Sequence, residues 1–470
     1  MSAPGERRAA PSRPAVPSGG RPPYPSGEGP VTCVVGGGLL GLATAWRLVQ
    51  AGHRVTVVEA AREWGGLASP WTLATPDGDV EWDRYYHVIA GADTALVGLL
   101  GELGLAERVV WKTTRTNFYD GRRLYPLNNA VDYLRLPALG AIDKLRLALT
   151  LHRGSRADNN LALEGQSAQA WLTQLGGARN WQRLWRPLLR SKLGSNVEHA
   201  SAAYIQAVVR RFYGAREGRS KRERFGYVQG GYRVVLDRLV AALRERGATL
   251  HAAWPVARVE RQADGRFAVS AAGDHEPLQA DQVVLTTPAP LSAAIAPQLE
   301  AAERERLCAL RWQGIVCASL LLTRPLGGAY MSYLTDEGLP FTTVIEMSTL
   351  VDRSAFGGLH LAYLPRYVPA DDAAFDKSDE ALLTEFIAGL TKMFPDLLPE
   401  HIVARRIARA RHVLAVPTQH YSRGKPPLAT SVPGLWIVNA SQIVNAALSV
   451  NDSVLHATSS VQQMLAETAA

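Results

Sequence analysis

The fold of this chain is decided by the stretch VTCVVGGGLLGLATAWRLVQAGHRVTVVE, residues 31–59. Residues 31–35 are a run of β-branched and other apolar residues, which is typical of a strand buried inside a parallel sheet. A glycine-rich turn follows, and then an amphipathic pattern from Leu39 to about Ala51. Residues 54–59 indicate a second strand that ends in an acid. The stretch therefore predicts a strand–turn–helix–strand unit.

The glycine-rich turn Gly36–Gly41 fits the pattern G-x-G-x-x-G. Its first glycine allows a tight turn, its second lets the backbone approach a pyrophosphate, and its third lets the helix pack closely on the strand. The free amide groups of the helix N-terminus then face the phosphates. Glu59 lies 18 residues after the last glycine, where a carboxylate can bind ribose hydroxyls and disfavours a 2′-phosphate. The unit predicts a dinucleotide site that does not take NADP.

Residues 59–67, EAAREWGGL, continue this motif and resemble the FAD fingerprint of the amine oxidase superfamily. That superfamily includes protoporphyrinogen oxidases, phytoene-type desaturases, monoamine oxidases and, more distantly, UDP-galactopyranose mutases. The resemblance implies that Gly65 and Gly66 extend the site for the pyrophosphate and the ribityl chain. It also implies a bound FAD. We expect this FAD to be non-covalent, because no cysteine lies in the C-terminal region where such enzymes attach it.

The resemblance recurs along most of the chain. Residues 228–232, VQGGY, look like the glycine pair ahead of the second helix of the FAD domain, and Val256 lies in a segment similar to the strand that meets the adenine. Residues 434–440 match the last strand, which normally ends in Gly-Asp or Gly-Glu. Asn439 and Ala440 stand there instead, so a neighbouring polar side chain would have to replace the missing carboxylate.

The last helix, expected from Asn451 to about Ala466, would point its positive N-terminal end at the flavin in a protein of this family. The residues that we expect to contact the cofactor are Gly36, Gly37, Gly38, Leu40, Gly41, Glu59, Ala60, Gly65, Gly66, Leu67, Tyr86, His87, Val256, Asn439, Ser441, Asn451, Asp452, Ser453 and Val454.

We expect an α/β fold in which a Rossmann-type FAD-binding domain with a parallel sheet is interleaved with an α+β substrate domain. The FAD-binding domain is predicted to be discontinuous, built from residues 31–90, 225–290 and 425–468. The substrate domain is expected to comprise residues 95–220, which look mainly helical, and residues 305–420, which alternate like strands around one helix.

Three residues are candidates for catalysis. His87 follows Tyr86 in the segment DRYYH, residues 83–87, where its near-neutral pKa would let it protonate or orient a substrate. The alternative is a packed aromatic loop with a satisfied histidine. Lys192 could hold an anionic substrate together with Arg190. Gln313 lies in the strand that resembles the one carrying the lysine of monoamine oxidases, so the amine oxidase mechanism is in doubt.

The segment that holds Lys192 also carries Trp181 and Trp185, four residues apart. Aromatic residues at this spacing are typical of a core, and a substrate cage is the alternative.

The composition fits a globular chain, with 47% hydrophobic and 20% charged residues. The net charge of +8 is spread along the chain, so we expect no nucleic-acid partner. The densest basic stretch, residues 210–224, is predicted to be a solvated face or loop, and the alternatives are contact with a phosphorylated substrate or a weak peripheral membrane contact. Residues 1–30 contain 17 Pro, Gly and Ser and are expected to form a disordered tail.

The three cysteines show no metal-ligand spacing, so we expect no metal and no disulfide framework. No apolar stretch reaches the roughly 18 residues of a membrane span, and the cytoplasm is the expected location. The oligomeric state stays open.

The sequence favours an enzyme of specialised metabolism that oxidises or desaturates a small organic substrate by hydride transfer to flavin N5. Oxygen or another acceptor would then reoxidise the flavin. The alternative is a non-redox flavoenzyme of the UDP-galactopyranose mutase type that acts on a nucleotide sugar. A catalytically silent FAD-binding scaffold is a third hypothesis.

Overall fold

The structure is a computed structural model that describes residues 28–137, 139–156, 161–214, 216–217, 222–444, 446 and 449–469. Most of the tail predicted at residues 1–30 lies outside the described residues, as do several positions of the basic stretch 210–224.

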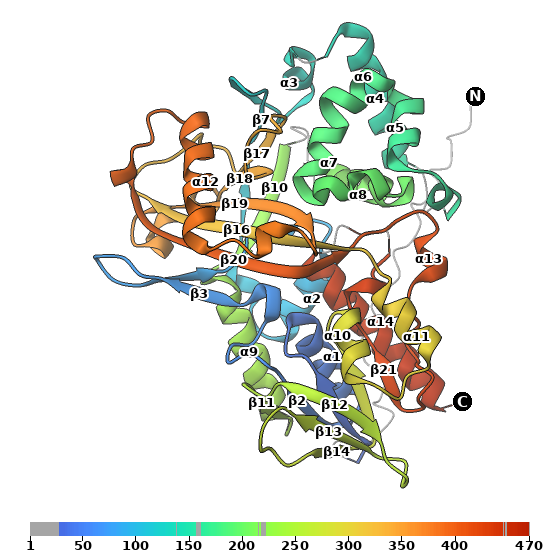
Figure 1. Cartoon of the computed structure of the whole chain (residues 1–470). Coiled ribbons are helices and arrows are strands. Elements are labelled where there is room, and N and C mark those ends of the chain that lie inside the picture. Colours follow the sequence, from blue (N-terminus) through green and yellow to red (C-terminus); the bar gives the residue numbers. More distant parts are fainter. Residues whose placement is uncertain are drawn as a thin grey trace, which may run out of the picture.

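A five-stranded parallel sheet forms the centre of the lower half of the molecule in Figure 1, in the order β11-β2-β1-β15-β21. These strands are β1 (Val31–Val35), β2 (Arg54–Val58), β11 (Thr249–His251), β15 (Gln282–Leu285) and β21 (Leu435–Ile437). They come from three separate segments of the chain. The predicted α/β fold with a parallel sheet is confirmed.

Both faces of this sheet are covered, which explains why its central strands are mostly apolar. Val34 on one face joins an apolar cluster with α1 (Leu39–Gln50), α2 (Thr94–Glu102), α9 (Gly231–Glu245) and α14 (Val450–Ala469). On the other face, Cys33 and Val35 pack against a small antiparallel sheet and two short helices. These elements are β12 (Val256–Arg261), β13 (Phe267–Ala271), β14 (Leu278–Ala280), α10 (Ala289–Ile295) and α11 (Ala301–Cys308).

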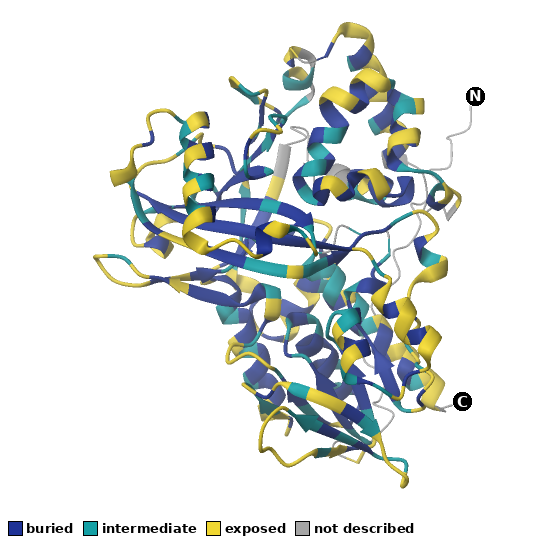
Figure 2. Cartoon of the chain, viewed as in Figure 1, coloured by how far each residue is buried: buried dark blue, intermediate teal, exposed yellow. Residues whose placement is uncertain are grey.

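A seven-stranded mixed sheet, in the order β20-β16-β19-β18-β17-β7-β8, crosses the upper half of Figure 1. Its strands are β7 (Thr116–Tyr119), β8 (Leu124–Pro126), β16 (Trp312–Leu322), β17 (Met331–Leu334), β18 (Thr343–Glu346), β19 (His360–Pro369) and β20 (Ile402–Ala415). Every residue of β16 is buried, because helix α12 (Asp379–Met393) covers one face and the hairpin of β3 (Pro70–Leu73) and β4 (Val80–Asp83) packs on the other. Figure 2 shows this buried layer in dark blue.

A group of helices stands beside the seven-stranded sheet, at the top right of Figure 1. It comprises α3 (Ala130–Arg135), α4 (Ala141–Arg156), α5 (Ala168–Gly176), α6 (Ala178–Asn180), α7 (Arg186–Leu193) and α8 (Ala202–Gly214). A small sheet in the order β5-β10-β6 connects the two halves, with β9 (Arg216–Glu217) beside β10. Its strands are β5 (Ile89–Ala90), β6 (Val109–Thr113) and β10 (Arg222–Val228). In the described part of the chain, no helix has both the length and the apolar character to cross a bilayer.

Candidate active site

The glycine-rich turn between β1 and α1 has no room for a side chain at Gly36 or Gly41. Gly36 adopts a φ of +112°, and a Cβ placed on Gly41 would lie 1.9 Å from the carbonyl oxygen of Gly36. A second glycine turn packs against the first, because the N–H of Gly65 donates to the carbonyl oxygen of Gly37 over 2.8 Å. A Cβ on Gly66 would approach the Cα of Gly38 to 3.1 Å. The two turns therefore form one cradle made of backbone.

The start of α1 is suited to a phosphate group. Its cap residue is Gly38, and no side chain of the described residues caps this helix. A Cβ on Gly38 would meet only the Cα of Gly66, at 3.9 Å, so the space in front of the helix is open. Backbone amide groups and the positive end of the helix dipole thus face a space that an anion can enter.

Glu59 lies at the end of β2, where the sequence predicts a ribose-binding acid. Its half-buried carboxylate accepts the N–H of Gly37 over 2.6 Å and the N–H of Ala61 over 2.8 Å. Its backbone bonds to His251 and Trp254, which fixes the connection from β11 to β12 beside it. This connection leads to Val256, the predicted adenine neighbour, which begins β12. The backbone cradle, the open helix end and the acid together fit FAD.

The predicted cofactor residues near the C-terminus are held by bonds within the protein. The Oδ1 of Asn439 accepts the N–H and the hydroxyl of Ser441, and its Nδ2 donates to the carbonyl oxygen of Thr287. The Oδ1 of Asn451 accepts the N–H of Leu96 over 3.0 Å.

Helix α14 begins one residue earlier than expected, and Ser449 forms a reciprocal cap with Asp452. The side chain of Val454 is in the core, while Ala60 is exposed and Leu40 and Leu67 are partly buried. Their contacts with the cofactor stay predictions.

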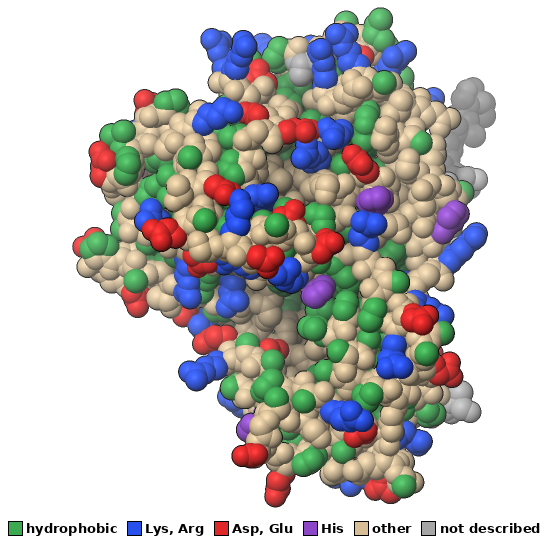
Figure 3. All heavy atoms as spheres, in the orientation of Figure 1, with side chains coloured by type: hydrophobic (Ala, Val, Ile, Leu, Met, Phe, Trp, Pro, Cys, Tyr) green, Lys and Arg blue, Asp and Glu red, His purple; other side chains and the backbone are tan. Residues whose placement is uncertain are grey.

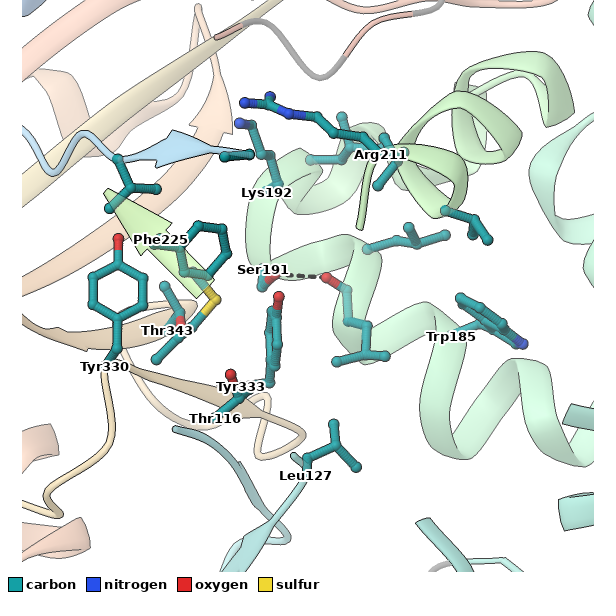
Figure 4. A pocket seen from close by; sticks show the side chains of 18 of the residues that line it. Thr116, Leu127, Trp185, Ser191, Lys192, Arg211, Phe225, Tyr330, Tyr333 and Thr343 are labelled. Atoms are coloured by element: carbon teal, nitrogen blue, oxygen red, sulfur yellow. Dashed lines mark hydrogen bonds between the residues drawn. The ribbon is translucent and has the colours of Figure 1, made fainter. Parts of the chain in front are cut away.

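A cavity of about 300 Å³ lies where the helices α4, α7 and α8 face the strands β7, β10, β17 and β18. Figure 4 shows its lining, which is mostly aromatic and aliphatic. Tyr86 and His87 line this cavity, and so does Lys192. The structure thus brings two of the three catalytic candidates together. Ser449 and Val450, at the start of α14, also line it, so the cavity reaches the N-terminus of that helix.

Polar groups gather at one end of this cavity. In Figure 4, Lys192 and Arg211 lie side by side at the end opposite Leu127. Arg211 donates to both carboxylate oxygens of Asp93 at 3.1 Å and lies 4.0 Å from Asp452. Within the described residues, the Nζ of Lys192 makes no hydrogen bond or ion pair. Its ammonium group is therefore free for a ligand in the cavity.

The buried surroundings change the protonation of both candidates. Loss of hydration, together with a smaller effect of the nearby Arg211, lowers the pKa of Lys192 to about 8, and Asp452 partly opposes this shift. Burial also lowers the pKa of His87 to about 4, with an added contribution from the charge of Lys192. At neutral pH His87 is neutral and Lys192 is mostly charged. The Nδ1 of His87 is buried and has no hydrogen-bond partner among the described residues.

Two of the residues expected in this region do not line the cavity, and the catalytic role of Gln313 stays a prediction. Arg190 does not join Lys192, because it pairs with Glu337 and does not line the cavity. Gln313 is fully buried, its Oε1 accepts a bond from Asn196 over 2.8 Å, and it does not line the cavity either.

The two tryptophans of the segment 181–185 differ in their surroundings. Both are buried in one π-helical turn and belong to the same apolar cluster, as expected for a core. Trp185 also lines the cavity, whereas Trp181 does not.

Sequence reasoning missed several residues of the cavity. Arg211 was hidden in a stretch interpreted as a solvated face, and Tyr330 gave no signal of its own. The hydroxyl of Tyr330 is buried without a hydrogen-bond partner among the described residues. The sequence Asp93-Thr94 is typical of a helix start and could have indicated where Asp93 lies. The carboxylate of Asp93 is the group that binds Arg211.

The chain is similar to other proteins both in sequence and in fold. The chain is 22% identical over 410 residues to the 15-cis-phytoene desaturase of Glycine max, which covers 83% of this chain and 70% of that protein. The solved structure of an oxidoreductase from Methanosarcina mazei aligns with a TM-score of 0.71 at 18% identity, over 92% of this chain and 100% of that one. Reduced UDP-galactopyranose mutase aligns with a TM-score of 0.69 at 14% identity, over 93% and 96% of the two chains.

The family described as "Flavin containing amine oxidoreductase" matches residues 41–460, which include the end of the glycine turn, the cavity and the start of α14. The chain is therefore an enzyme of the flavin-containing amine oxidoreductase family.

Proposed function

We propose that this enzyme uses non-covalently bound FAD to oxidise or desaturate a small, largely apolar organic substrate that carries one polar group. The observation that supports this proposal best is the distribution of apolar and charged residues in the lining of the cavity. Its walls are mostly apolar and aromatic, and its charged end holds Lys192, which has no partner among the described residues, next to the start of α14.

The cofactor would be held by the two glycine turns, by the open N-terminus of α1 and by Glu59. When bound, FAD supplies the acceptor for the two electrons and the hydrogen removed from a substrate C–H bond. Oxygen or another acceptor would take up the electrons afterwards.

The residues of the chain bind and orient the substrate. The apolar walls exclude water and bury the body of the substrate, which strengthens polar interactions at the other end. The charged Nζ of Lys192 would bind an anionic or carbonyl oxygen of the substrate. The unpartnered Nδ1 of His87 and the hydroxyl of Tyr330 would complete its hydrogen bonds, because buried polar groups rarely stay unpaired.

The similarity to a phytoene desaturase supports desaturation over amine oxidation, and the lack of a lysine at Gln313 is in keeping with this. The mutase alternative is supported less well, because a nucleotide sugar carries a diphosphate that the apolar walls of this cavity do not accommodate.

The test is to purify the flavoprotein and to mix it anaerobically with apolar carboxylic acids, amines and polyenes while its visible absorbance is recorded. The proposal expects at least one of these compounds to bleach the flavin, and oxygen or an added quinone to restore it. Turnover that requires prior reduction with dithionite, with no net change in flavin absorbance, would favour the mutase type instead.

A further inference from the structure

Helix α4 carries an exposed apolar stripe. Ile142, Leu145 and Leu149 are 69%, 64% and 47% exposed, and their spacing of three and four residues places them on one side of the helix. Val131 on the neighbouring α3 is 51% exposed. These four side chains are half of the strongly exposed large hydrophobic residues in the described part of the chain. Such a cluster marks a surface that binds something apolar.

Basic residues border this stripe. Arg146 and Arg153 are exposed and lie on the same side of the helix as Ile142, about one turn and about three turns further along it. The sequence of α4 contains one acid, Asp143, and this residue is buried. In Figure 3, Lys and Arg side chains lie among hydrophobic ones at the top of the molecule, the end that carries α3 and α4 to α6.

The opposite side of the same helix forms a wall of the cavity. Leu147 and Leu151 of α4 line it, and so does Tyr133 of α3. The helix therefore separates the cavity from an apolar, basic outer surface.

We infer that α3 and α4 dock onto a membrane surface that contains anionic lipids, with the stripe in the apolar layer and the arginines at the headgroups. A helix with an apolar stripe and flanking cations is suited to this position. A second copy of the chain fits less well, because a twofold contact through the stripe would bring the same arginines together. An enzyme docked in this way could take up an apolar substrate from the membrane. This consequence rests on the proposed function, whereas the docking itself does not.

The test is co-sedimentation of the full-length flavoprotein, without substrate, with vesicles of phosphatidylcholine alone or mixed with phosphatidylglycerol. We expect binding to the mixed vesicles and an about tenfold or greater loss of binding in the double variant Leu145→Ser/Leu149→Ser. The matched control is Leu291→Ser/Leu398→Ser, at positions 49% and 47% exposed on other elements, and it should bind like the wild type.

The variant Arg146→Ser/Arg153→Ser tests the same surface without touching the stripe, and it should lose the preference for phosphatidylglycerol. The inference is overturned if the wild type does not bind mixed vesicles, or if stripe and control variants bind equally. It is also overturned if sedimentation without vesicles shows a dimer that the stripe variant loses. Because no substrate is present, these results do not depend on the reaction.

Discussion

The substitution Gly41→Ala tests the cofactor cradle directly. A Cβ at this position would lie 1.9 Å from the carbonyl oxygen of Gly36, far below the 3.4 Å at which ordinary contact begins. The obstacle is a backbone atom, so no side chain can turn away to relieve it. The first turn of α1 has to move away from β1 or the glycine turn has to deform, and both changes displace the amide groups that face the phosphates.

The size of the effect follows from this overlap. Overpacking of a tight site costs about 1–3 kcal/mol, and a bound cofactor prevents the helix from relaxing. At about 1.4 kcal/mol for each factor of ten, FAD affinity should fall by roughly tenfold to a hundredfold. The matched control is Gly98→Ala in α2, where a Cβ would meet nothing within 4 Å. That variant should be neutral or more stable by about 0.5–1 kcal/mol, because alanine is the better helix former.

The assay is the ratio of flavin to protein after purification, together with the dissociation constant for FAD added to the apoprotein. Gly41→Ala should lose flavin on dilution and recover it at high FAD concentration, while Gly98→Ala should keep a full complement. If Gly41→Ala binds FAD as tightly as the wild type and melts at the same temperature, the close packing of the glycine turn on α1 is not what holds the cofactor.

Three further predictions concern the cavity and its support. In the wild type, kcat/KM should fall as the pH rises through about 8, the pKa of Lys192. The Lys192→Met variant should have a higher KM and should not show this fall. A variant with the same pH profile as the wild type would refute the role of Lys192. Tyr330→Phe should raise KM without lowering Tm, since the hydroxyl has no partner among the described residues, and a lower Tm would contradict this. Burial raises the pKa of Asp83 from 3.8 to about 7, so the folded state loses stability as pH rises between these values. At 1.36 kcal/mol per pKa unit, this loss amounts to about 4 kcal/mol of unfolding free energy, and the Asp83→Asn variant should lack it. Urea unfolding at several pH values measures the unfolding free energy of both proteins. If this free energy changes with pH in the same way in both, the prediction is refuted.

The sequence predicts the cofactor half of the fold well because its signals are local. The strand at residues 31–35 has the predicted bounds, and α1 ends at Gln50, one residue before the expected end. A buried strand, a glycine turn and an amphipathic helix each depend on neighbours in the chain. The substrate half was harder, since β7 and the long β20 pair with strands far away in sequence.

The error over Arg190 has a simple physical cause. On a helix, residues two positions apart point in different directions, so Arg190 and Lys192 of α7 cannot reach one site. The cation that does lie beside Lys192 is Arg211, from α8, because the buried carboxylate of Asp93 holds it there. Sequence spacing alone could have excluded the first pair, but only the tertiary contact between Arg211 of α8 and Asp93, the residue before α2, identifies the second.

The cavity has a direction, and this direction constrains the reaction. Its polar end is built from Lys192, His87 and the start of α14, while its other end is closed by Leu127 and the apolar side of α4. A substrate that placed its polar group against α4 would lose the charged hydrogen bond to Lys192, at a cost of about 1–3 kcal/mol, so binding favours one orientation. The polar group then lies at the end that meets the FAD domain, and the apolar body extends toward α4. Changes to the apolar body should therefore alter KM, whereas removal of the polar group should lower kcat/KM by roughly fivefold to a hundredfold.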